Sequence, residues 1–292
     1  MVESSMNLKK LLPTARKMKQ VIKPAAPVKF LDESSKRDLI DRYSQKEFAE
    51  LDYALVRDFC DSSDHLPQIC HLNGDLKNVQ RAWTVKAVLG TLPLGSRLLE
   101  IGGGVPLAAG MLAELGYDVT IVDPYEGAGN GPTEYEAYKQ QFPNVKFTRS
   151  YFSDDLQGYE DASFDGIYSI SVLEHIPLVD LDSVYRGIHK FLRQGGRSIH
   201  CLDIVVEGDR TDAHKATLKK VFYLQKGLVQ GPCSQSDTDH LCDEMLENMA
   251  RDLETFYLSA EGHNLWRGST LYEEFPFRKV ISAQTCVSYH NN

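Results

Sequence analysis

The sequence predicts an α/β fold with a mostly parallel β-sheet and helices on both of its faces. Short apolar runs at residues 98–101, 119–122 and 166–170 have the length and composition of buried strands. Stretches with apolar residues at helical spacing separate these runs. Strands that alternate with helices in this way form a parallel sheet that is covered on both faces.

A glycine-rich turn follows the first apolar run. Residues 102–104 are all glycine, which allows a tight turn and a close approach of a ligand to the backbone. The helix expected over residues 105–115 points its amino end at this turn, and Gly116 ends that helix. The next strand ends on Asp123, where a carboxylate can accept hydrogen bonds from both hydroxyls of a ribose. We therefore expect a nucleoside-binding βαβ unit.

Two residues near the turn indicate which nucleoside binds. The dinucleotide motif G-x-G-x-x-G requires a glycine where this chain has Leu107. Glu100 lies two residues before the first glycine, where a buried anion would oppose a pyrophosphate on the same helix end. The carboxylate of Glu100 instead suits a cationic ligand with an ammonium and a sulfonium group. The ligand implied is S-adenosylmethionine, and these residues disfavour a nicotinamide-dependent oxidoreductase.

Four segments resemble the ordered motifs of the class I S-adenosylmethionine-dependent methyltransferases. They are Leu99-Glu-Ile-Gly-Gly-Gly, Ile121-Val-Asp, Phe164-Asp-Gly-Ile-Tyr-Ser-Ile-Ser-Val-Leu-Glu-His-Ile and Phe191-Leu-Arg-Gln-Gly-Gly-Arg. Four motifs in the right order over about residues 75–205 are a specific signal. The resemblance implies a Rossmann-like, mostly parallel seven-stranded sheet with N-terminal helices and a helical cap insertion. It also implies S-adenosylmethionine as cofactor, with S-adenosylhomocysteine as the product.

The turn, the strand ends beside it and the resemblance together name the expected cofactor-binding residues. The resemblance implies that an acidic side chain after the third strand, here Asp154, accepts from the adenine amino group. It also implies that an apolar neighbour, here Phe152, lies against the adenine ring. The full set is Glu100, Gly102, Gly103, Gly104, Asp123, Pro124, Phe152, Asp154, Ser169 and Ile170.

Methyl transfer is an in-line displacement, so the protein mainly aligns donor and nucleophile in a water-poor site. A hydroxyl acceptor must also lose its proton, which requires a base with a pKa near neutral. His175 is the first candidate because it closely follows the fourth strand, and Asp203 on the fifth strand is also expected in the catalytic site. The alternatives are a packing or capping role for His175, and His200, His214 or His240 as the base.

The sequence favours a site without a metal. Some relatives bind a metal through Glu-x-x-Glu-His, but this chain has Ser171 in place of the first glutamate. Cys233, His240 and Cys242 follow no usual zinc spacing.

Helical spacing of apolar residues over residues 35–59 predicts one long helix or two short ones, and a further helix is expected over residues 75–89. The resemblance implies that helices before the glycine turn lie over the methionine end of the cofactor. Tyr43 and Arg81 are therefore candidate lid residues, with packing or a surface position as the alternative.

Residues 207–272 form a longer segment than an ordinary connection and are interpreted as a helical cap, with one helix over residues 237–257. Aromatic side chains of the cap suit stacking on a sugar or a planar acceptor. We expect Tyr223 and Trp266 of the cap, together with Tyr43, to contact the acceptor.

Composition narrows the class of partner. The chain has 292 residues, 42% of them hydrophobic, and a net charge of −9. The positive charge is concentrated in residues 1–30, so the remainder is acidic, which disfavours an RNA acceptor, and no DNA partner is expected. Six widely spaced cysteines favour reduced thiols and a cytoplasmic location, and no apolar run reaches the length of a membrane span.

We divide the chain into three parts. Residues 1–30 form a basic, flexible arm, for which contact with a membrane surface is a weaker alternative. Residues 31–206 and 273–292 form the methyltransferase core with N-terminal lid helices, and residues 207–272 form the helical cap. Within the core, residues 279–289 alternate in the manner of an edge strand.

The sequence thus predicts an S-adenosylmethionine-dependent methyltransferase that acts on a hydroxyl of a small molecule or glycan. N- or C-methylation, a protein or RNA acceptor, and a non-catalytic module that binds cofactor or a partner are the alternatives. The expected partner is a small-molecule or carbohydrate acceptor, and the sequence leaves the number of subunits open.

Overall fold

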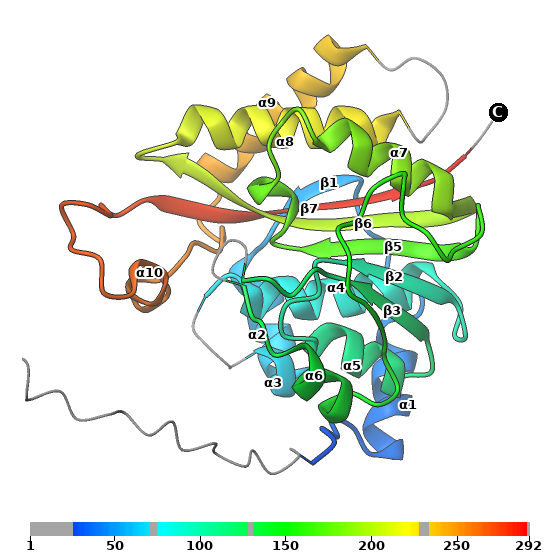
Figure 1. Ribbon diagram of the computed structural model, residues 1–292. Coiled ribbons are helices and arrows are strands. Elements are labelled where there is room, and N and C mark those ends of the chain that lie inside the picture. Colours follow the sequence, from blue (N-terminus) through cyan, green and yellow to red (C-terminus); the bar gives the residue numbers. More distant parts are fainter. Residues whose placement is uncertain (1–25, 71–74, 128–130, 228–233, 291–292) are drawn as a thin grey trace, which may run out of the picture.

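The computed structural model describes residues 26–70, 75–127, 131–227 and 234–290, and Figure 1 shows their arrangement. A seven-stranded sheet forms the centre, with the strand order β1-β7-β6-β5-β2-β3-β4. Helices cover both faces of this sheet (Figure 1). The predicted seven-stranded, mostly parallel sheet between two helical layers is confirmed. Most of the basic arm predicted over residues 1–30 lies outside the described residues.

Five parallel strands make up the larger part of the sheet. They are β2 (Arg97–Ile101), β3 (Asp118–Val122), β4 (Lys146–Thr148), β5 (Phe164–Ile170) and β6 (Leu192–Glu207). The chain moves outward from β2 to β3 and β4 and then crosses to β5 on the other side of β2. The switch in strand order therefore falls between β2 and β5. Sheets of this kind bind ligands at the switch, outside the carboxyl ends of the strands.

The last strand, β7 (Lys279–Ser288), is antiparallel to β6 and pairs on its other side with β1 (Leu51–Tyr53). The prediction of an edge strand at this position is wrong, because β1 occupies the edge. The region that was predicted to be helical contains α1 (Glu33–Tyr43), then β1, then α2 (Val56–His65). Three residues are too few to display an alternating pattern, so only pairing with β7 reveals this strand.

One face of the sheet is covered by α4 (Lys77–Thr91) and α5 (Leu107–Glu114), with α1 packed on α4. The short helices α3 (Pro67–Cys70) and α6 (Tyr135–Gln141) lie on the same side (Figure 1). Apolar side chains of these helices form one hydrophobic core with strand residues such as Leu98.

The opposite face carries α7 (Leu181–Phe191), α8 (Thr211–Lys226) and α9 (Gln235–Arg251) (Figure 1). Phe222 of α8 and Met245 of α9 are buried in a second core with residues of β5, β6 and β7. Two helices of the predicted cap therefore pack in the layer on the sheet. The division into core and cap stays a prediction.

The predicted helix over residues 237–257 ends earlier, at Arg251. The chain beyond α9 returns to the sheet, where Thr255 and Tyr257 form isolated bridges with Leu55 and Ile281. A backbone that pairs with strands cannot continue a helix, which explains the shorter α9. The next helix, α10 (Ala260–Arg267), lies at the end of the sheet near β6 and β7 (Figure 1). Every helix among the described residues is too short or too polar to span a bilayer.

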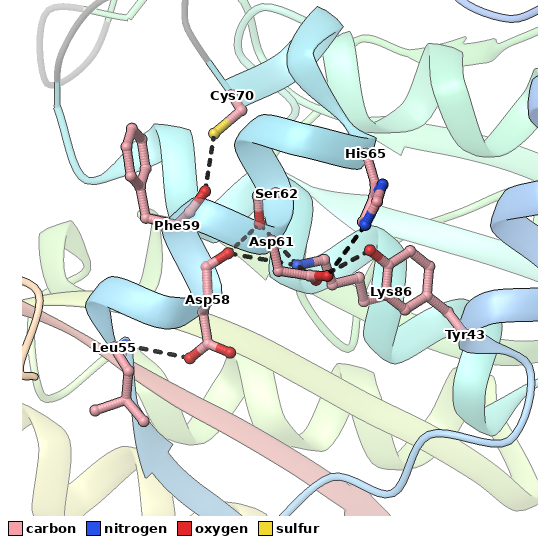
Figure 2. Close-up of polar contacts among 9 residues, drawn as sticks. All are labelled: Tyr43, Leu55, Asp58, Phe59, Asp61, Ser62, His65, Cys70 and Lys86. Carbon is pink, nitrogen blue, oxygen red and sulfur yellow. Dashed lines mark hydrogen bonds and ion pairs between the residues drawn. The ribbon is translucent and has the colours of Figure 1, made fainter.

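A group of four polar residues, the Lys86 cluster, holds the N-terminal helices on α4; three of them are buried and Asp61 is partly exposed. It consists of Tyr43, Asp61, Ser62 and Lys86 (Figure 2). Nζ of Lys86 donates to Oδ2 of Asp61 at 2.5 Å and to Oγ of Ser62 at 2.8 Å. The hydroxyl of Tyr43 donates to the same carboxylate at 2.9 Å. Because the four residues come from α1, α2 and α4, the cluster ties three helices together.

Candidate active site

The carboxyl ends of β2, β5 and β6 meet at one edge of the sheet, here called the carboxyl edge. Ile101 at the end of β2 pairs in register with Ser169 of β5. Ser169 in turn pairs with His200 of β6. Ile170, the last residue of β5, is buried at this edge. Because β6 continues beyond His200 to Glu207, its last residues extend past the carboxyl end of β5.

The glycine turn after β2 lies at the carboxyl edge and has one open side. Gly102 and Gly104 have φ angles of +66° and +50°, which favour glycine. A Cβ atom on Gly103 would lie 2.5 Å from the side chain of Ile121, so the turn packs tightly on β3. A Cβ atom on Gly104 would meet no other atom within 4 Å. The open side of Gly104 is therefore where a ligand can approach bare backbone.

The carboxylate of Asp123 is oriented over this turn by backbone N–H groups. Its Oδ2 atom accepts from the N–H of Gly104 at 3.1 Å, and its Oδ1 atom accepts from the N–H of Tyr125 at 2.6 Å. Pro124 lies between these two contacts, and its carbonyl accepts from Nε of Arg149 at 3.1 Å. Asp123 thus joins the end of β3 to the open side of the turn.

Glu100 is buried at the end of β2, beside the turn. It is 3% exposed, and its Oε2 atom accepts from the hydroxyl of Tyr168 at 3.1 Å. Burial raises the pKa of Glu100 to about 8, while the hydrogen bond from Tyr168 and the guanidinium of Arg81 oppose this rise. Glu100 is therefore mostly protonated at neutral pH, and a further positive charge nearby would ionise it.

A second group of polar side chains, the Asp203 cluster, lies where β6 extends past β5. It consists of Lys77, Gln80, Ser171, Glu174 and Asp203. The carboxylate of Asp203 accepts from Nε2 of Gln80 and from Oγ of Ser171, both at 2.7 Å. The N–H of Asp203 donates to Oε1 of Glu174 at 3.0 Å, and Nζ of Lys77 donates to Oγ of Ser171 at 3.3 Å. The cluster therefore joins α4, β6 and the segment after β5.

Two features distinguish the Asp203 cluster from ordinary packing. Ser171 has a φ of +54°, which is strained for a residue with a side chain. Oε2 of Glu174 is buried without a hydrogen-bond partner, and burial next to Asp203 raises the pKa of Glu174. Backbone strain and unsatisfied buried polar atoms occur preferentially at functional sites.

The structure brings the predicted catalytic residues His175 and Asp203 to the carboxyl edge. His175 ends the short 3-10 helix η2 (Leu173–His175), which follows β5. Loss of water around the ring lowers the pKa of His175, while the carboxylate of Asp203 acts in the opposite direction. The two side chains are therefore electrostatic neighbours, and Asp203 is itself fixed by Gln80 and Ser171.

The alternative bases differ in their surroundings. His200 is fully buried, with Nδ1 2.8 Å from Oγ of Ser169 and Nε2 2.8 Å from Oγ of Ser198. Burial lowers the pKa of His200 to about 3, so this histidine is a neutral core residue. His214 of α8 lies closer to the site, because its Nδ1 donates to the carbonyl of Asp203 at 2.9 Å.

The residues predicted to contact adenine, Phe152 and Asp154, lie beside α7. The ring of Phe152 is buried against that of Phe191, with centroids 6.1 Å apart. The carboxylate of Asp154 accepts from Nε of Arg186 at 2.7 Å and from Oγ of Ser183 at 2.5 Å. These contacts hold the pKa of Asp154 at about 2. Asp154 is thus an ionised acid that already has partners on α7.

Tyr43, predicted to contact the acceptor, lies away from the carboxyl edge. Its side chain is buried in the Lys86 cluster (Figure 2). Lys86 follows Lys77 of the Asp203 cluster by nine residues on α4, which corresponds to about 13 Å along a helix. The structure therefore does not bring Tyr43 together with the glycine turn.

The two aromatic residues predicted from the cap lie at different distances from the carboxyl edge. Tyr223 lies near the C-terminal end of α8. There Gln225 donates to the carbonyl of Ser198 in the first half of β6. Trp266 of α10 packs against a small core that includes Val205, two residues beyond Asp203 in the chain. Of these two side chains, only Trp266 lies near the site.

Sequence reasoning missed the role of α4 in the site. Gln80 and Thr84 contact Asp203 and Cys201 of β6, and Lys77 reaches Ser171. Polar residues at helical spacing are normally interpreted as a solvent-exposed face. The overlooked signal is that α4 contains only two charged residues after Lys77, so it has no clearly polar face.

No group of three or more His, Cys, Asp or Glu side chains in the described part of the chain is arranged to hold a metal ion. Of the residues considered for zinc, Cys233 lies outside the described residues, His240 is on α9, and Cys242 is buried in the second core.

The chain is similar to known proteins over part of its length. Residues 99–200 match a family model described as a methyltransferase domain. A protein of Mycobacterium tuberculosis (strain H37Rv), described only as uncharacterized, is 31% identical over 121 residues. These residues make up 39% of this chain and 38% of the relative. The chain thus spans well under half the length of the curated relatives that it matches.

Two solved structures resemble the chain more distantly. Phosphoethanolamine N-methyltransferase 2 of Haemonchus contortus, in complex with S-adenosyl-L-methionine, is 18% identical with a TM-score of 0.47, over 82% of this chain and 60% of that one. The 1,6-didemethyltoxoflavin-N1-methyltransferase of Burkholderia thailandensis, with S-adenosylhomocysteine, is 16% identical with a TM-score of 0.43, over 81% of this chain and 87% of that one.

The matched region spans β2 to β6, which includes the glycine turn, Asp123 and η2. Over this region the chain is similar to a methyltransferase domain. The residues present fit S-adenosylmethionine, the cofactor that the sequence implies. The space over Gly104 admits a ligand, Asp123 carries a carboxylate beside it, and Glu100 is a buried acid without an ion-pair partner among the described residues.

Proposed function

We propose that this protein is an S-adenosylmethionine-dependent methyltransferase that methylates a hydroxyl of a small molecule or glycan. The observation that carries the cofactor assignment is the open side of Gly104, bordered by the carboxylate of Asp123. The methyltransferase-domain match over residues 99–200 supports the reaction class. The choice of a hydroxyl acceptor depends on His175 and on the carboxyl groups of the Asp203 cluster.

In this proposal each part of the cofactor has a counterpart in the chain. When bound, S-adenosylmethionine supplies an electrophilic methyl group on a sulfonium. Asp123 accepts hydrogen bonds from the ribose hydroxyls, and Glu100 provides negative charge for the cationic end. The bare backbone of residues 102–104 lets the ligand come close to the end of β2.

The proton of the acceptor hydroxyl leaves through a base at the carboxyl edge. His175 follows β5 and is the first choice, because its pKa is held below the ordinary histidine value and its ring is therefore neutral at pH 7. Asp203 lies next to it and stabilises the positive charge that the ring acquires. Gln80 and Ser171 keep Asp203 in place for this role.

Calorimetry tests the cofactor assignment directly. We expect S-adenosylmethionine and S-adenosylhomocysteine to bind and NAD not to bind. Asp123→Ala should weaken S-adenosylhomocysteine binding by about two orders of magnitude, since two hydrogen bonds to a charged acceptor are lost. Asp118→Ala, partly exposed at the other end of the same strand, is the control and should bind like the wild type. Unchanged binding by Asp123→Ala would remove the assignment.

N-methylation or C-methylation, a protein or RNA acceptor, and a non-catalytic module that binds cofactor or a partner stay as alternatives. Mass spectrometry of metabolites that lose one methyl group when the gene is deleted identifies the acceptor. The proposal includes a cytoplasmic location, which the free thiols of five described cysteines support; they are Cys60, Cys70, Cys201, Cys242 and Cys286.

A further inference from the structure

Lys77, the first residue of α4, places a cation at the carboxyl edge. Its Nζ atom donates to Oγ of Ser171 at 3.3 Å, and Ser171 directly follows the last residue of β5. Lys77 is partly exposed, and its ammonium forms no ion pair with a carboxylate of the described residues. An ammonium has three N–H groups, and Ser171 takes up one of them. The other two can bind a ligand.

The hydroxyl of Ser171 holds this ammonium in place. It donates to Oδ2 of Asp203 at 2.7 Å while it accepts from Lys77. Ser171 and Asp203 are both buried, and the backbone of Ser171 is strained at a φ of +54°. Because the hydroxyl lies between them, the ammonium and the carboxylate of Asp203 are not in direct contact. The chain therefore fixes a positive charge beside the residues that we propose for the proton transfer.

The ammonium of Lys77 also acts on the proposed base. His175 follows Ser171 by four residues, at the end of η2. Loss of water around the ring lowers the pKa of His175, and the ammonium of Lys77 lowers it further. The acids that Lys77 influences are Asp75 and Glu174. A histidine with a lowered pKa is a weak base, so the acidity of the acceptor hydroxyl becomes decisive.

The size of the pKa gap separates two kinds of hydroxyl. An aliphatic hydroxyl is about as weak an acid as water, with a pKa of about 16, whereas an ordinary histidine has a pKa of about 6.5. Proton transfer between them is unfavourable by more than about nine orders of magnitude. A phenolic hydroxyl has a pKa of about 10, which reduces the gap to about four orders. A cation close to the oxygen lowers such a pKa by about one to three units, so Lys77 can close most of the gap for a phenol only.

An aromatic side chain near Lys77 fits the same kind of acceptor. Trp266 of α10 packs against a small core that contains Leu76 and Val205. Leu76 directly precedes Lys77, and Val205 follows Asp203 by two residues. Trp266 is only partly buried, so part of its indole can stack on a planar ring.

We propose that Lys77 is a catalytic residue that stabilises the negative charge on the acceptor oxygen, and that the acceptor is a small molecule with a phenolic hydroxyl. This inference rests on the proposed function, because it requires methyl transfer to a hydroxyl at the carboxyl edge. The hydroxyl proton passes to the ring of His175, and the oxygen forms its bond to the methyl carbon. The electron pair of the broken carbon–sulfur bond stays on sulfur, and His175 then releases its proton to water.

The probe 4-nitrophenol tests this proposal, because its anion absorbs visible light and its neutral form does not. The full chain is first saturated with S-adenosylhomocysteine, and the absorbance of the bound probe is then measured against pH. We expect the wild type to bind the anion at least about tenfold more tightly than the neutral phenol, which lowers the pKa of the bound probe by about one unit or more. The comparison ligand 4-nitrobenzyl alcohol has the same ring with an aliphatic hydroxyl, and its affinity should not depend on Lys77.

Three variants make the test selective. Lys77→Met should bind the anion and the neutral phenol within about twofold of each other, because the stabilising charge is lost. Its affinity for S-adenosylhomocysteine should stay within about twofold of the wild type, since Lys77 is not among the proposed cofactor residues. Lys77→Arg keeps the charge and should retain part of the preference for the anion. Lys146→Met, at the exposed amino end of β4, is the matched control and should behave like the wild type. Thermal unfolding checks that each variant folds.

A wild-type preference for the anion in Lys77→Met would overturn the inference. A wild type that binds S-adenosylhomocysteine but shows no preference for the anion, or does not bind 4-nitrophenol at millimolar concentration, would overturn it as well. Failure of the wild type to bind S-adenosylhomocysteine is a different result, which would refute the proposed function together with the inference.

Discussion

Two buried cations on the same helix have opposite surroundings. Lys86 and Arg81 are five residues apart on α4 and are 1% and 7% exposed. Lys86 is hydrogen-bonded to Asp61 and Ser62 in the Lys86 cluster (Figure 2). Arg81 has a buried nitrogen without a partner and no ion pair within the described residues. The first cation is paired within the chain, whereas the second has no ion-pair partner among the described residues.

The comparison shows how a structural charge can be told from a binding charge. Burial by itself does not distinguish them, since both side chains are inside. The difference lies in the partners, because a buried ion pair that holds elements together must satisfy its own charge. Arg81 and Glu100 influence each other electrostatically, and within the described part of the chain neither belongs to an ion pair, so the burial of the guanidinium charge is unfavourable.

Breaking the Lys86 cluster should have the largest effect. Asp61→Ala leaves the ammonium of Lys86 buried without its carboxylate, so we expect the free energy of unfolding to fall by about 3 kcal/mol. Binding of S-adenosylhomocysteine should stay unchanged, because the cluster lies away from the carboxyl edge. Urea denaturation and calorimetry measure the two quantities. Asp64→Ala, exposed on the same helix, is the control.

Arg81→Met should behave in the opposite way, with a change in the free energy of unfolding below about 1 kcal/mol, because it removes a charge that has no partner in the free protein. If Arg81→Met were as destabilising as Asp61→Ala, the distinction between the two cations would be lost.

The next effect concerns pH. The pKa of Glu100 is raised from 4.5 to about 8 in the folded protein, so Glu100 carries a proton at pH 6 and must lose it when the ammonium of the ligand arrives. Affinity for S-adenosylhomocysteine should therefore rise up to about tenfold per pH unit from pH 6 and level off near pH 8. Glu100→Gln should remove this dependence. Calorimetry over the pH range, in two buffers with different ionisation heats, also counts the proton released.

Glu100 also makes the stability of the fold depend on pH, and its contribution falls as pH rises, whereas the affinity for the ligand rises. Since the folded state holds the proton of Glu100 more tightly than the unfolded state, the contribution of Glu100 to stability is greatest below pH 4.5 and is lost as pH rises to about 8. Comparison of Glu100→Gln with the wild type isolates this contribution. A rise in the contribution of Glu100 with pH would contradict the assignment of the buried proton.

The smallest effect tests the open side of the turn. Gly104→Ala and Gly95→Ala introduce a Cβ atom at positive φ with no other atom within 4 Å, so each should reduce the free energy of unfolding by about 1 kcal/mol. Only Gly104→Ala should also weaken S-adenosylhomocysteine, because Gly95 precedes β2 at the other end of the strand. Equal ligand affinity in the two variants would mean that the ligand does not approach Gly104.

Much of the fold could be predicted because its elements are long or carry distinctive residues. The apolar runs of β2, β3 and β5 and the glycine turn lie where the sequence indicated them. The switch in strand order then follows from the general behaviour of such sheets. The short strand β1 could not be predicted, because three residues have no visible period and only β7 gives them a partner.

The candidate site was predictable in part. The positions of Asp123 and Glu100 follow from their place after and within predicted strands, and the structure puts both at the turn. The partners of Asp154 on α7 and the burial of Tyr43 against Asp61 were not predictable. Each of these contacts joins segments that are far apart in the chain. Local sequence patterns do not show which distant segments come into contact.

The sequence alone determined the order of the longer strands and helices and the chemistry of the glycine turn, because both depend on the spacing of residues that are close in the chain. Only the tertiary structure decided which polar residues are satisfied. Lys86 and Arg81 are both basic residues of one helix, and the sequence does not show that their surroundings differ. Asp61 of α2 forms an ion pair with Lys86, whereas no described residue forms an ion pair with Arg81.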